Sequence, residues 1–257
     1  MPRIEKEKSW PDSTRLALVQ KCAKDIEPDS ADSKSWLQNY ARAHSHRIAF
    51  DVEIVERYSA KEDVIVEFGS LPLLLTASLK TLGYSVQGID LDPNRFAAAI
   101  CRLDLRVLKC DVETERLPLD AGSCDVAIFN ELFEHLRINP IFTMGEVHRI
   151  LKPNGILLLS TPNLRSLEGF VNFLFRNKAY SCLGSIYDEY KKLEHLGHMG
   201  HVREYTTREV SEFLSRCGFR LQTFVFRGRY DQILARQVVR LIPSLRPFVT
   251  YVARANK

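Results

Sequence analysis

Short apolar, β-branched runs alternate with longer stretches of helical periodicity from about residue 60 onward. The runs predict strands over 64–68, 86–90, 107–111, 124–130 and 155–160. The stretches between them predict helices over 72–82, 92–103 and 140–151. Strands and helices that alternate at this spacing form parallel strands joined by crossover helices.

The alternation pauses after Asn163 for roughly 40 residues, a length that compact domains seldom leave without structure unless it serves binding. It then resumes with Thr206-x-x-Glu209, which predicts a capping box for a helix that Gly218 ends. Two further strands near 221–226 and 248–253 flank a helix over 232–241. The pattern predicts a Rossmann-like α/β fold with a seven-stranded, mostly parallel sheet and helices on both faces.

The N-terminal part differs in pattern from the rest. Residues 1–33 are polar, contain three prolines and are expected to form a partly ordered arm. Apolar positions between 35 and 58 suit one or two amphipathic helices that lead into the domain. We therefore expect an arm and helices over 1–59 and one α/β domain over 60–257, with a helical insertion over 164–204.

Composition supports this division and excludes several classes of protein. With 257 residues, 45% apolar and 26% charged, the chain fits one substantial α/β domain. It contains no uncharged apolar run of about 18 residues and begins with a charged segment, so we expect a cytoplasmic protein without a membrane span. A net charge of +4 is too small to predict a nucleic-acid partner. Six cysteines without a C-x-x-C pair are expected to be reduced.

Polar residues stand at the end of each of the first four predicted strands. They are Glu67, Asp90, Asp111 and the pair Asn130–Glu131. In an open parallel sheet, ligands bind beyond the carboxyl ends of the strands. One such residue is most simply a helix cap or a turn residue, but four in register indicate a ligand site.

The position of Asp90 suggests the kind of ligand. It follows Gly69 by 21 residues, the separation at which an acidic residue of Rossmann-type folds reaches ribose hydroxyls. A carboxylate accepts two hydrogen bonds from a vicinal diol and repels a 2′-phosphate. The spacing therefore predicts an adenosine-containing ligand.

An ordered set of motifs carries a resemblance to a known family. The motifs are Val-Ile-Val-Glu-Phe-Gly (64–69), Gly-Ile-Asp (88–90), Lys-Cys-Asp-Val-Glu (109–113), Leu-Pro-Leu-Asp (117–120), Cys-Asp-Val-Ala-Ile-Phe-Asn-Glu-Leu-Phe-Glu-His-Leu (124–136), Arg-Ile-Leu-Lys-Pro-Asn-Gly (149–155) and Ser-Thr-Pro-Asn (160–163). With these motifs the chain resembles the class I S-adenosylmethionine-dependent methyltransferases, in particular the ubiquinone and small-molecule type. The resemblance covers about 60–163 and resumes over 201–219. It implies an antiparallel last strand and S-adenosylmethionine as cofactor.

The resemblance also implies roles for individual residues. The amino-acid half of the cofactor would lie beside Glu67 and Gly69, with Asp90 on the ribose and Asn130 and Glu131 near the methyl group. The remaining residues assigned to cofactor binding are Phe68, Ser70, Leu91, Asp111 and Val112, of which the last two would contact the adenine.

The turn after Gly69 departs from the glycine-rich pattern of the family. It reads Ser70-Leu71-Pro72-Leu73, and Pro72 has no amide hydrogen to donate. We expect this turn to pass close to the methionine part of the cofactor with few free amides. S-adenosylmethionine carries no phosphate, so it tolerates this loss better than a nucleotide would.

Two histidines are candidates for a catalytic base, which methyl transfer to a hydroxyl or a protonated amine can use. They are His135, just after the fourth strand, and His201, at the end of the insertion. The cluster His195-x-x-His198-x-x-His201 also suggests a metal site. Neighbouring glycines and the absence of an interleaved carboxylate disfavour that interpretation, so no metal is expected and contacts to a lid or acceptor are preferred.

The function predicted from the sequence is methyl transfer to an oxygen or nitrogen of a small-molecule, saccharide or lipid-linked acceptor. A non-catalytic domain with a degenerate cofactor turn is the alternative. A nicotinamide-dependent oxidoreductase is disfavoured because no G-x-G-x-x-G follows the first strand. Four arginines near the C-terminus suggest peripheral membrane contact, although packing explains the neighbouring apolar positions as well; they are Arg236, Arg240, Arg246 and Arg254.

Overall fold

The computed structural model of the protein describes residues 2–5, 11–182, 185–196 and 200–257, and of residues 193–196 it describes the backbone alone. The strands are β1 (Arg3–Glu5), β2 (Val64–Phe68), β3 (Ser85–Asp90), β4 (Val107–Lys109), β5 (Cys124–Asn130), β6 (Leu151–Pro162), β7 (Phe219–Arg227) and β8 (Phe248–Ala255). The α-helices are α1 (Ser13–Asp25), α2 (Ala31–Tyr58), α3 (Leu74–Thr81), α4 (Ala97–Arg102), α5 (Pro140–Ile150), α6 (Leu167–Arg176), α7 (Ile186–Leu196), α8 (Thr207–Arg216) and α9 (Ile233–Leu241).

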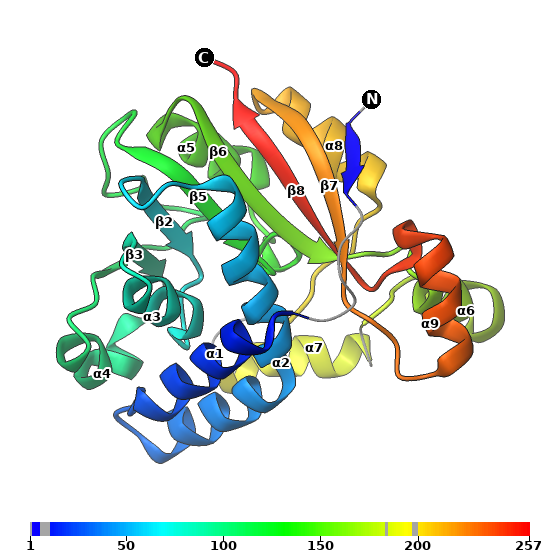
Figure 1. Cartoon of the computed structure of the whole chain (residues 1–257), viewed down its shortest axis with the longest axis horizontal. Helices are drawn as coiled ribbons and strands as arrows, with labels where there is room; N and C mark the ends of the chain where they lie inside the picture. The colour runs from blue at the N-terminus through cyan, green and yellow to red at the C-terminus, as the bar shows by residue number, and fades with distance from the viewer. Residues whose placement is uncertain (1, 6–10, 183–184, 197–199) are drawn as a thin grey trace. The chain divides into compact units, whose positions relative to one another are not determined.

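The sheet contains eight strands in the order β1-β7-β8-β6-β5-β2-β3-β4 (Figure 1), so the predicted number of seven is wrong. The additional strand is β1, which pairs in parallel with β7 and places Ile4 opposite Phe224. The last strand, β8, is antiparallel to β7, as the resemblance implied. A strand of three residues whose partner lies more than 200 positions away leaves no periodic pattern, so the sequence could not reveal it.

The expected N-terminal arm is also corrected by the structure. Residues 13–25 form α1, which begins at the N-cap Asp12 and buries Val19 and Cys22. The expected helices over 35–58 form one continuous helix, α2, of 28 residues. The two helices pack along each other, and both contact α3 (Figure 1).

The chain divides into two compact units, of which one comprises residues 10–128 and 149–156. In this unit β2 pairs in parallel with β3 on one side and with β5 on the other. The register places Glu67 opposite Gly88 of β3 and Ile128 of β5. The ends of β2 and β3 are therefore level with each other, which brings the residues that follow them to one edge of this unit.

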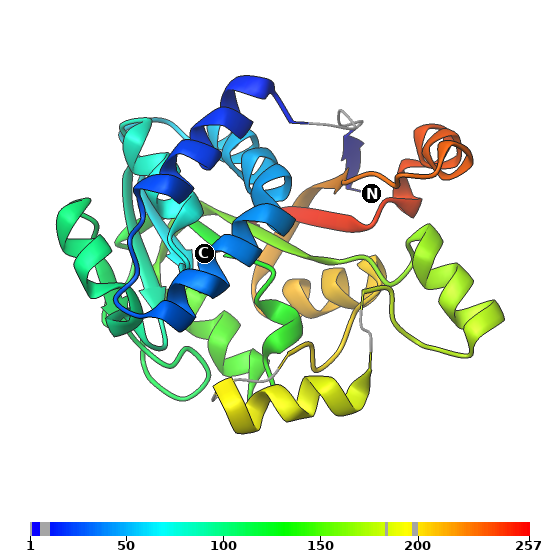
Figure 2. The same ribbon diagram turned by 90° about the horizontal axis from the view of Figure 1, so that it is seen from below.

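The other unit comprises residues 1–9, 129–148 and 157–257. Its helix α8 begins with the predicted capping box, in which the side chains of Thr206 and Glu209 each accept the other's backbone amide, and it packs on β7. Helices α6 and α7 lie in the segment between β6 and α8. Figures 1 and 2 both place α6 and α9 at the same end of this unit.

Two further sequence-based expectations concern the whole chain. All six cysteines are free. Among the residues that the structure describes, no helix is both long and apolar enough to cross a membrane.

Candidate functional site

The backbone amides of the turn after β2 donate hydrogen bonds within the protein, first to the neighbouring strand β3. Gly69 has a positive φ of 67°, which only glycine adopts without strain. The amides of Gly69 and Ser70 both donate to the carbonyl of Ile89 in β3, at 2.9 and 3.3 Å. The turn is thereby attached to the neighbouring strand.

The rest of the turn continues in the same way. The Leu71 amide donates to Oδ2 of Asp90 at 2.9 Å, and the Leu73 amide donates to the Ser70 carbonyl at 2.7 Å. Pro72 between them has no amide hydrogen. Every amide from Gly69 to Leu73 is thus bonded within this unit, so a ligand at the turn must be held by side chains and carbonyl groups.

Ser70 and Gly88 fit against each other at this turn. Ser70 is buried, and its Oγ would lie 2.4 Å from a Cβ atom built on Gly88. Real Cβ atoms essentially never lie so close to another atom. The Ser70 side chain therefore fits here only because residue 88 is a glycine and has no Cβ. The Ser70 hydroxyl is buried and has no hydrogen-bond partner among the described residues.

Glu67 lies at the end of β2 with its carboxyl group buried, and Oε2 accepts a short hydrogen bond from the hydroxyl of Thr76 on α3. Burial raises the pKa of Glu67 to about 8, with a smaller contribution from the charges of Asp51 and Asp90. The free protein therefore holds this carboxyl largely protonated at neutral pH. A cation beside it would reverse that preference.

Asp90 ends β3, and its carboxylate is anchored by backbone amides. Oδ2 accepts from Leu71 and Oδ1 accepts from Asp92 at 3.3 Å. Burial raises the pKa of Asp90, and these amides oppose the rise. A carboxylate offers about four lone-pair sites, so each oxygen can still accept from a ligand hydroxyl. Leu91 beside it is 49% exposed and offers an apolar surface.

Asp111, two residues after β4, serves its own turn. Its Oδ1 accepts from the Glu113 amide at 3.0 Å, and its own amide donates to Glu115 at 2.9 Å. Val112 between them is partly exposed. The structure thus gives Asp111 the turn-stabilising role considered from the sequence, and the predicted adenine contact stays a prediction.

The residues predicted at the end of β5, Asn130 and Glu131, lie in the other unit. Oδ1 of Asn130 is buried and has no hydrogen-bond partner among the described residues. Glu131 has a positive φ of 50°, and its Oε1 accepts from the Ser160 hydroxyl at 2.7 Å. Arg227 at the end of β7 is buried, donates to the same hydroxyl at 2.8 Å and lies 3.5 Å from Glu131. Glu131 is therefore part of a buried ion pair, which the sequence did not predict.

The two predicted catalytic histidines lie together. The rings of His135 and His201 meet edge to face with centroids 4.9 Å apart. His135 ends the 3₁₀ turn η2 (Phe133–His135), and the carbonyl of Glu134 in this turn accepts the amides of Val202 and Arg203. These backbone bonds hold the segment after His201 against η2.

Two buried carboxylates that sequence reasoning missed orient His201. The His201 amide donates to Oε2 of Glu189 on α7 at 3.2 Å. Oε1 of Glu204 lies 3.6 Å from Nδ1 of His201, and the same carboxylate accepts the amides of Ser181 and Cys182. Burial alone would raise the pKa of Glu204, but hydrogen bonds from His201 and Ser181 hold it below its usual range. No periodic pattern links these positions, so their contact with His201 could not be predicted from the sequence.

The predicted histidine cluster is described only in part. His198 and the side chain of His195 lie outside the described residues. His201 has instead the neighbours Glu134 and His135, and one ligand atom from each of the three lies within 4.8 Å of the others. The carboxylate that the sequence cluster lacked is thus supplied by a distant segment.

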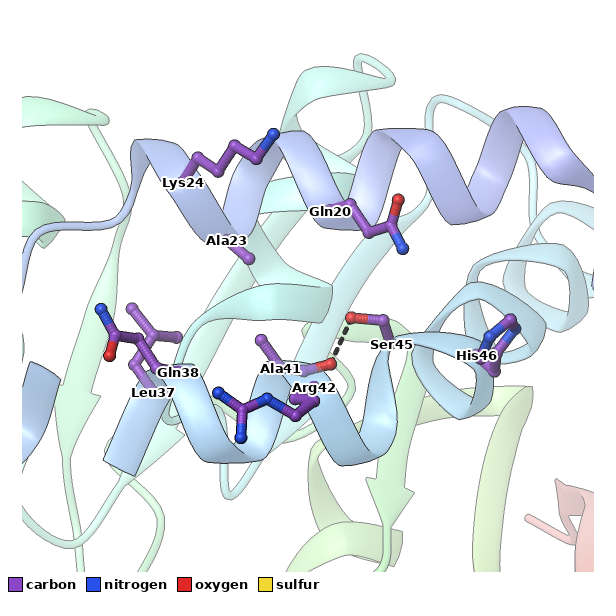
Figure 3. Close-up of a pocket in the computed structure, with 9 residues that line it drawn as sticks. All are labelled: Gln20, Ala23, Lys24, Leu37, Gln38, Ala41, Arg42, Ser45 and His46. Carbon is purple, nitrogen blue, oxygen red and sulfur yellow. Dashed lines mark hydrogen bonds between the residues drawn. The ribbon is translucent and has the colours of Figure 1, made fainter. Parts of the chain in front are cut away.

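A groove of about 580 Å³ lies between α1 and α2 (Figure 3). Its lining residues are Gln20, Ala23, Lys24, Leu37, Gln38, Ala41, Arg42, Ser45 and His46. The Ser45 hydroxyl donates to the Ala41 carbonyl within α2. None of the residues predicted to bind a cofactor or to act in catalysis lines this groove.

Comparison with known families identifies one domain. Residues 66–159 match the family model described as "Methyltransferase domain". This segment includes Glu67 to Ser70, Asp90, Asp111 and the residues around His135. No curated protein matches the chain.

Solved structures with the same fold extend over most of the chain. One belongs to a complex between the Haloferax volcanii Trm112 methyltransferase activator and the putative methyltransferase, with 20% identity, coverage of 95% of this chain and 98% of that chain, and a TM-score of 0.59. A possible histamine N-methyltransferase from Thermotoga maritima has 18% identity, coverage of 86% and 95%, and a TM-score of 0.57.

A third similar structure contains ligands. It is the Burkholderia thailandensis 1,6-didemethyltoxoflavin-N1-methyltransferase with bound 1,6-didemethyltoxoflavin and S-adenosylhomocysteine. It has 15% identity, coverage of 99% of this chain and 94% of that chain, and a TM-score of 0.56. At these identities the likeness shows a shared fold.

Proposed function

We propose that the chain is a methyltransferase of the ubiquinone and small-molecule type. It would transfer the methyl group of S-adenosylmethionine to an oxygen or nitrogen of a small-molecule, saccharide or lipid-linked acceptor. The domain match over 66–159 and the shared fold support the class I S-adenosylmethionine-dependent methyltransferases. When bound, the cofactor supplies a methyl group on a positively charged sulfur atom.

The observation that carries the proposal is the arrangement of Asp90 beside the turn after β2. Its carboxylate accepts one backbone amide on each oxygen and keeps lone pairs for the two hydroxyls of a ribose. The neighbouring buried carboxyl of Glu67 suits the cofactor's ammonium group, and the turn has no free amides for a phosphate. These features fit an adenosine that carries an amino acid better than a dinucleotide.

Asn130 and the histidine pair would serve the reacting groups. The buried Oδ1 of Asn130 lacks a partner among the described residues and is an acceptor for a donor group of the ligand. His201 or His135 would take the proton of the acceptor hydroxyl or amine. Glu204 beside Nδ1 of His201 would fix the tautomer and stabilise the protonated ring.

Exposed apolar side chains on two helices support a choice among the acceptor classes. Those on α6 are Phe170, Phe173, Leu174 and Phe175, and those on α9 are Ile233, Leu234 and Leu241. Tyr230 bonds to α6 and to the 3₁₀ turn η3 (Pro243–Leu245), because its hydroxyl accepts the Glu168 amide and donates to the Leu245 carbonyl. This 3₁₀ turn contacts α9. This set, named the apolar end, favours a lipid-linked acceptor presented at a bilayer.

The charges near the apolar end suit an anionic bilayer surface. Arg236 and Arg240 are exposed on α9, as the membrane interpretation of the sequence required. Arg246 does not take part, since it is buried and donates to the Gly228 carbonyl at 2.8 Å. Arg254 lies in β8 opposite Arg220 of β7, so its position follows from strand packing.

Calorimetric titration with S-adenosylhomocysteine tests the cofactor assignment. We expect wild-type protein to bind and Asp90→Ala to bind about tenfold more weakly or worse, because two ribose hydrogen bonds to a charged acceptor are lost. Asp92→Asn is the matched control: Asp92 is exposed, and its side chain makes no capping bond. Absence of binding at millimolar ligand would favour the non-catalytic alternative, and equal affinity of the Asp90 variant would refute the ribose assignment.

A further inference from the structure

Glu134, His135 and His201 form a compact group of potential metal ligands in one of the two units. Each offers one donor atom, and the three atoms lie within 4.8 Å of one another. From this geometry we propose that the group binds a single divalent transition-metal cation, with one carboxylate oxygen and two imidazole nitrogens as ligands. This set is named the Glu-His-His cluster.

The distances require little movement for coordination. Ligands bound tetrahedrally at about 2.1 Å from zinc are about 3.4 Å apart. Nε2 of His201 lies 3.9 Å from Oε1 of Glu134, about half an ångström more. No pair among the three donor atoms is more than 4.8 Å apart, so the largest difference to be closed by side-chain rotation is about 1.4 Å.

The burial of the carboxylates near the cluster favours the binding of a cation. Glu134 and Glu204 are both buried, and the ring of His201 lies 3.9 Å from Oε1 of the first and 3.6 Å from Oε1 of the second. Buried carboxylates that lie close to one another repel each other, and a cation among them offsets that cost. Arg227 faces Glu131, at 3.5 Å, so a positive charge at Glu134 would complement a second part of the same acidic region.

The surroundings hold the ligands in place before any metal binds. The carbonyl of Glu134 accepts two amides from the segment after His201, and the His201 amide is bonded to Glu189. The His201 ring lies between two buried carboxylates, with Nδ1 3.6 Å from Oε1 of Glu204 and Nε2 3.9 Å from Oε1 of Glu134. A carboxylate behind a histidine ligand is the usual outer-shell arrangement of metal sites.

This site differs from the one considered in the sequence. The pattern 195-x-x-198-x-x-201 lacked a carboxylate, whereas the Glu-His-His cluster uses only its last histidine. Glu134 and His135 come from the turn after β5, about 65 positions earlier in the chain. Hence the two assignments predict different effects of substituting His195 and His198.

Ligand chemistry selects the metal. Two imidazoles and one carboxylate suit zinc or another late first-row cation better than magnesium, which prefers oxygen ligands. Three protein ligands also leave a position for an oxygen of water or of the acceptor. A bound cation would replace the histidine base of the proposed function, because an imidazole that binds the cation has no lone pair left to accept a proton. Its polarisation of an acceptor hydroxyl rests on the proposed function, but the binding of the cation does not.

The test is metal binding by chelator-treated, full-length protein without cofactor. Equilibrium dialysis against Zn²⁺, Mn²⁺ or Mg²⁺, followed by elemental analysis, should give one tightly bound Zn²⁺ per chain, weaker Mn²⁺ and weakest Mg²⁺. Glu134→Gln keeps the shape of the side chain and His201→Asn removes a second ligand. Each should weaken Zn²⁺ binding about tenfold or more.

Two controls make the result specific. His44→Asn changes a histidine on α2 that packs against Tyr40, and it should leave Zn²⁺ binding unchanged. The double variant His195→Asn/His198→Asn should also retain it. Thermal melting identifies any variant that does not fold, in which case the other ligand variant decides.

The proposal is overturned if the wild-type chain binds no Zn²⁺ at micromolar concentration. It is equally overturned if Glu134→Gln and His201→Asn bind as wild type, or if only the 195/198 variant loses binding. Since the measurement uses no S-adenosyl ligand, its failure would leave the cofactor titration untouched, and failure of that titration would leave the metal result standing.

Discussion

At the scale of single residues, the burial of the Glu67 carboxyl group has a free-energy cost that a positively charged ligand would offset. Glu67 is buried, and its pKa is raised to about 8 chiefly by burial, with Asp51 and Asp90 contributing through their charges. A glutamine in its place could accept the same hydrogen bond from Thr76 without that cost. A carboxylate is needed only if a positive group comes to lie beside it, as the cofactor's ammonium group would.

Cofactor affinity should therefore depend on pH through Glu67. Below pH 8 the carboxyl is largely protonated in the free protein, and contact with an ammonium group requires it to ionise, so binding releases a proton. Affinity for S-adenosylhomocysteine should rise as the pH rises from 5.5 to 7.5, by up to about tenfold per unit. Titration in buffers of different ionisation enthalpy measures the released proton directly.

Glu67→Gln is the matched variant for this prediction, because it keeps the side-chain shape and cannot ionise. Its affinity should be lower at pH 7.5 and should change less with pH than that of wild type. The same pH dependence in both proteins would show that another group, such as Asp90, is responsible.

At the scale of elements, the turn after β2 and strand β3 are joined by hydrogen bonds and by side-chain packing. Three amides of the turn donate hydrogen bonds to the Ile89 carbonyl and the Asp90 carboxylate. The Ser70 side chain fills the space beside Gly88. The shape of the turn thus comes from contacts with β3, where the family pattern relies on glycines. This explains how a turn with one glycine and a proline can keep Asp90 in place.

Gly88→Ala should disrupt this packing. The new Cβ would lie 2.4 Å from the Ser70 Oγ and 2.7 Å from its Cβ, so the turn must shift. We expect a loss of about 1–3 kcal/mol in the free energy of unfolding, measured by urea denaturation. Ser70→Gly removes both clashing atoms, so the alanine should cost much less in that background. Additive effects of the two substitutions would contradict the proposed contact.

The elements also show which parts of the fold can be predicted from a sequence pattern. Strands β2 and β5 were predicted to the residue, because apolar runs bounded by polar residues mark buried parallel strands. Helix α8 was predicted from its capping box. Helix α1 was missed, since it buries only Val19 and Cys22 and depends on packing along α2.

The candidate site also contains residues that the sequence located and contacts that it could not predict. Asp90 and Glu67 could be placed at strand ends from the sequence, because a local pattern locates such ends, and their role in binding stays a prediction. The pairing of Glu131 with Arg227, and of His201 with Glu204 and Glu189, depends on contacts between distant segments. A single sequence contains no periodic trace of such contacts.

At the scale of the whole molecule, the similar structures share the fold along nearly the whole chain, with coverage of 95% for one and 99% for another. Fold of this kind does not fix the acceptor. What distinguishes this chain must be sought in its own surface. Phe173, Phe175 and Leu234 are 65%, 81% and 78% exposed, an unusual concentration of apolar surface on α6 and α9.

Binding to anionic lipid vesicles tests whether the apolar end meets a membrane. In sedimentation assays the protein should bind phosphatidylglycerol vesicles more strongly than phosphatidylcholine vesicles, and salt should weaken the binding because Arg236 and Arg240 contribute charge. Phe173→Glu/Phe175→Glu should lower the partition coefficient about tenfold or more, as two aromatic side chains leave the bilayer surface. Ile141→Glu is the control, because this side chain on α5 is 68% exposed and lies outside the apolar end. Equal loss of binding in both variants, or equal binding to the two lipids, would direct the search to an acceptor in solution.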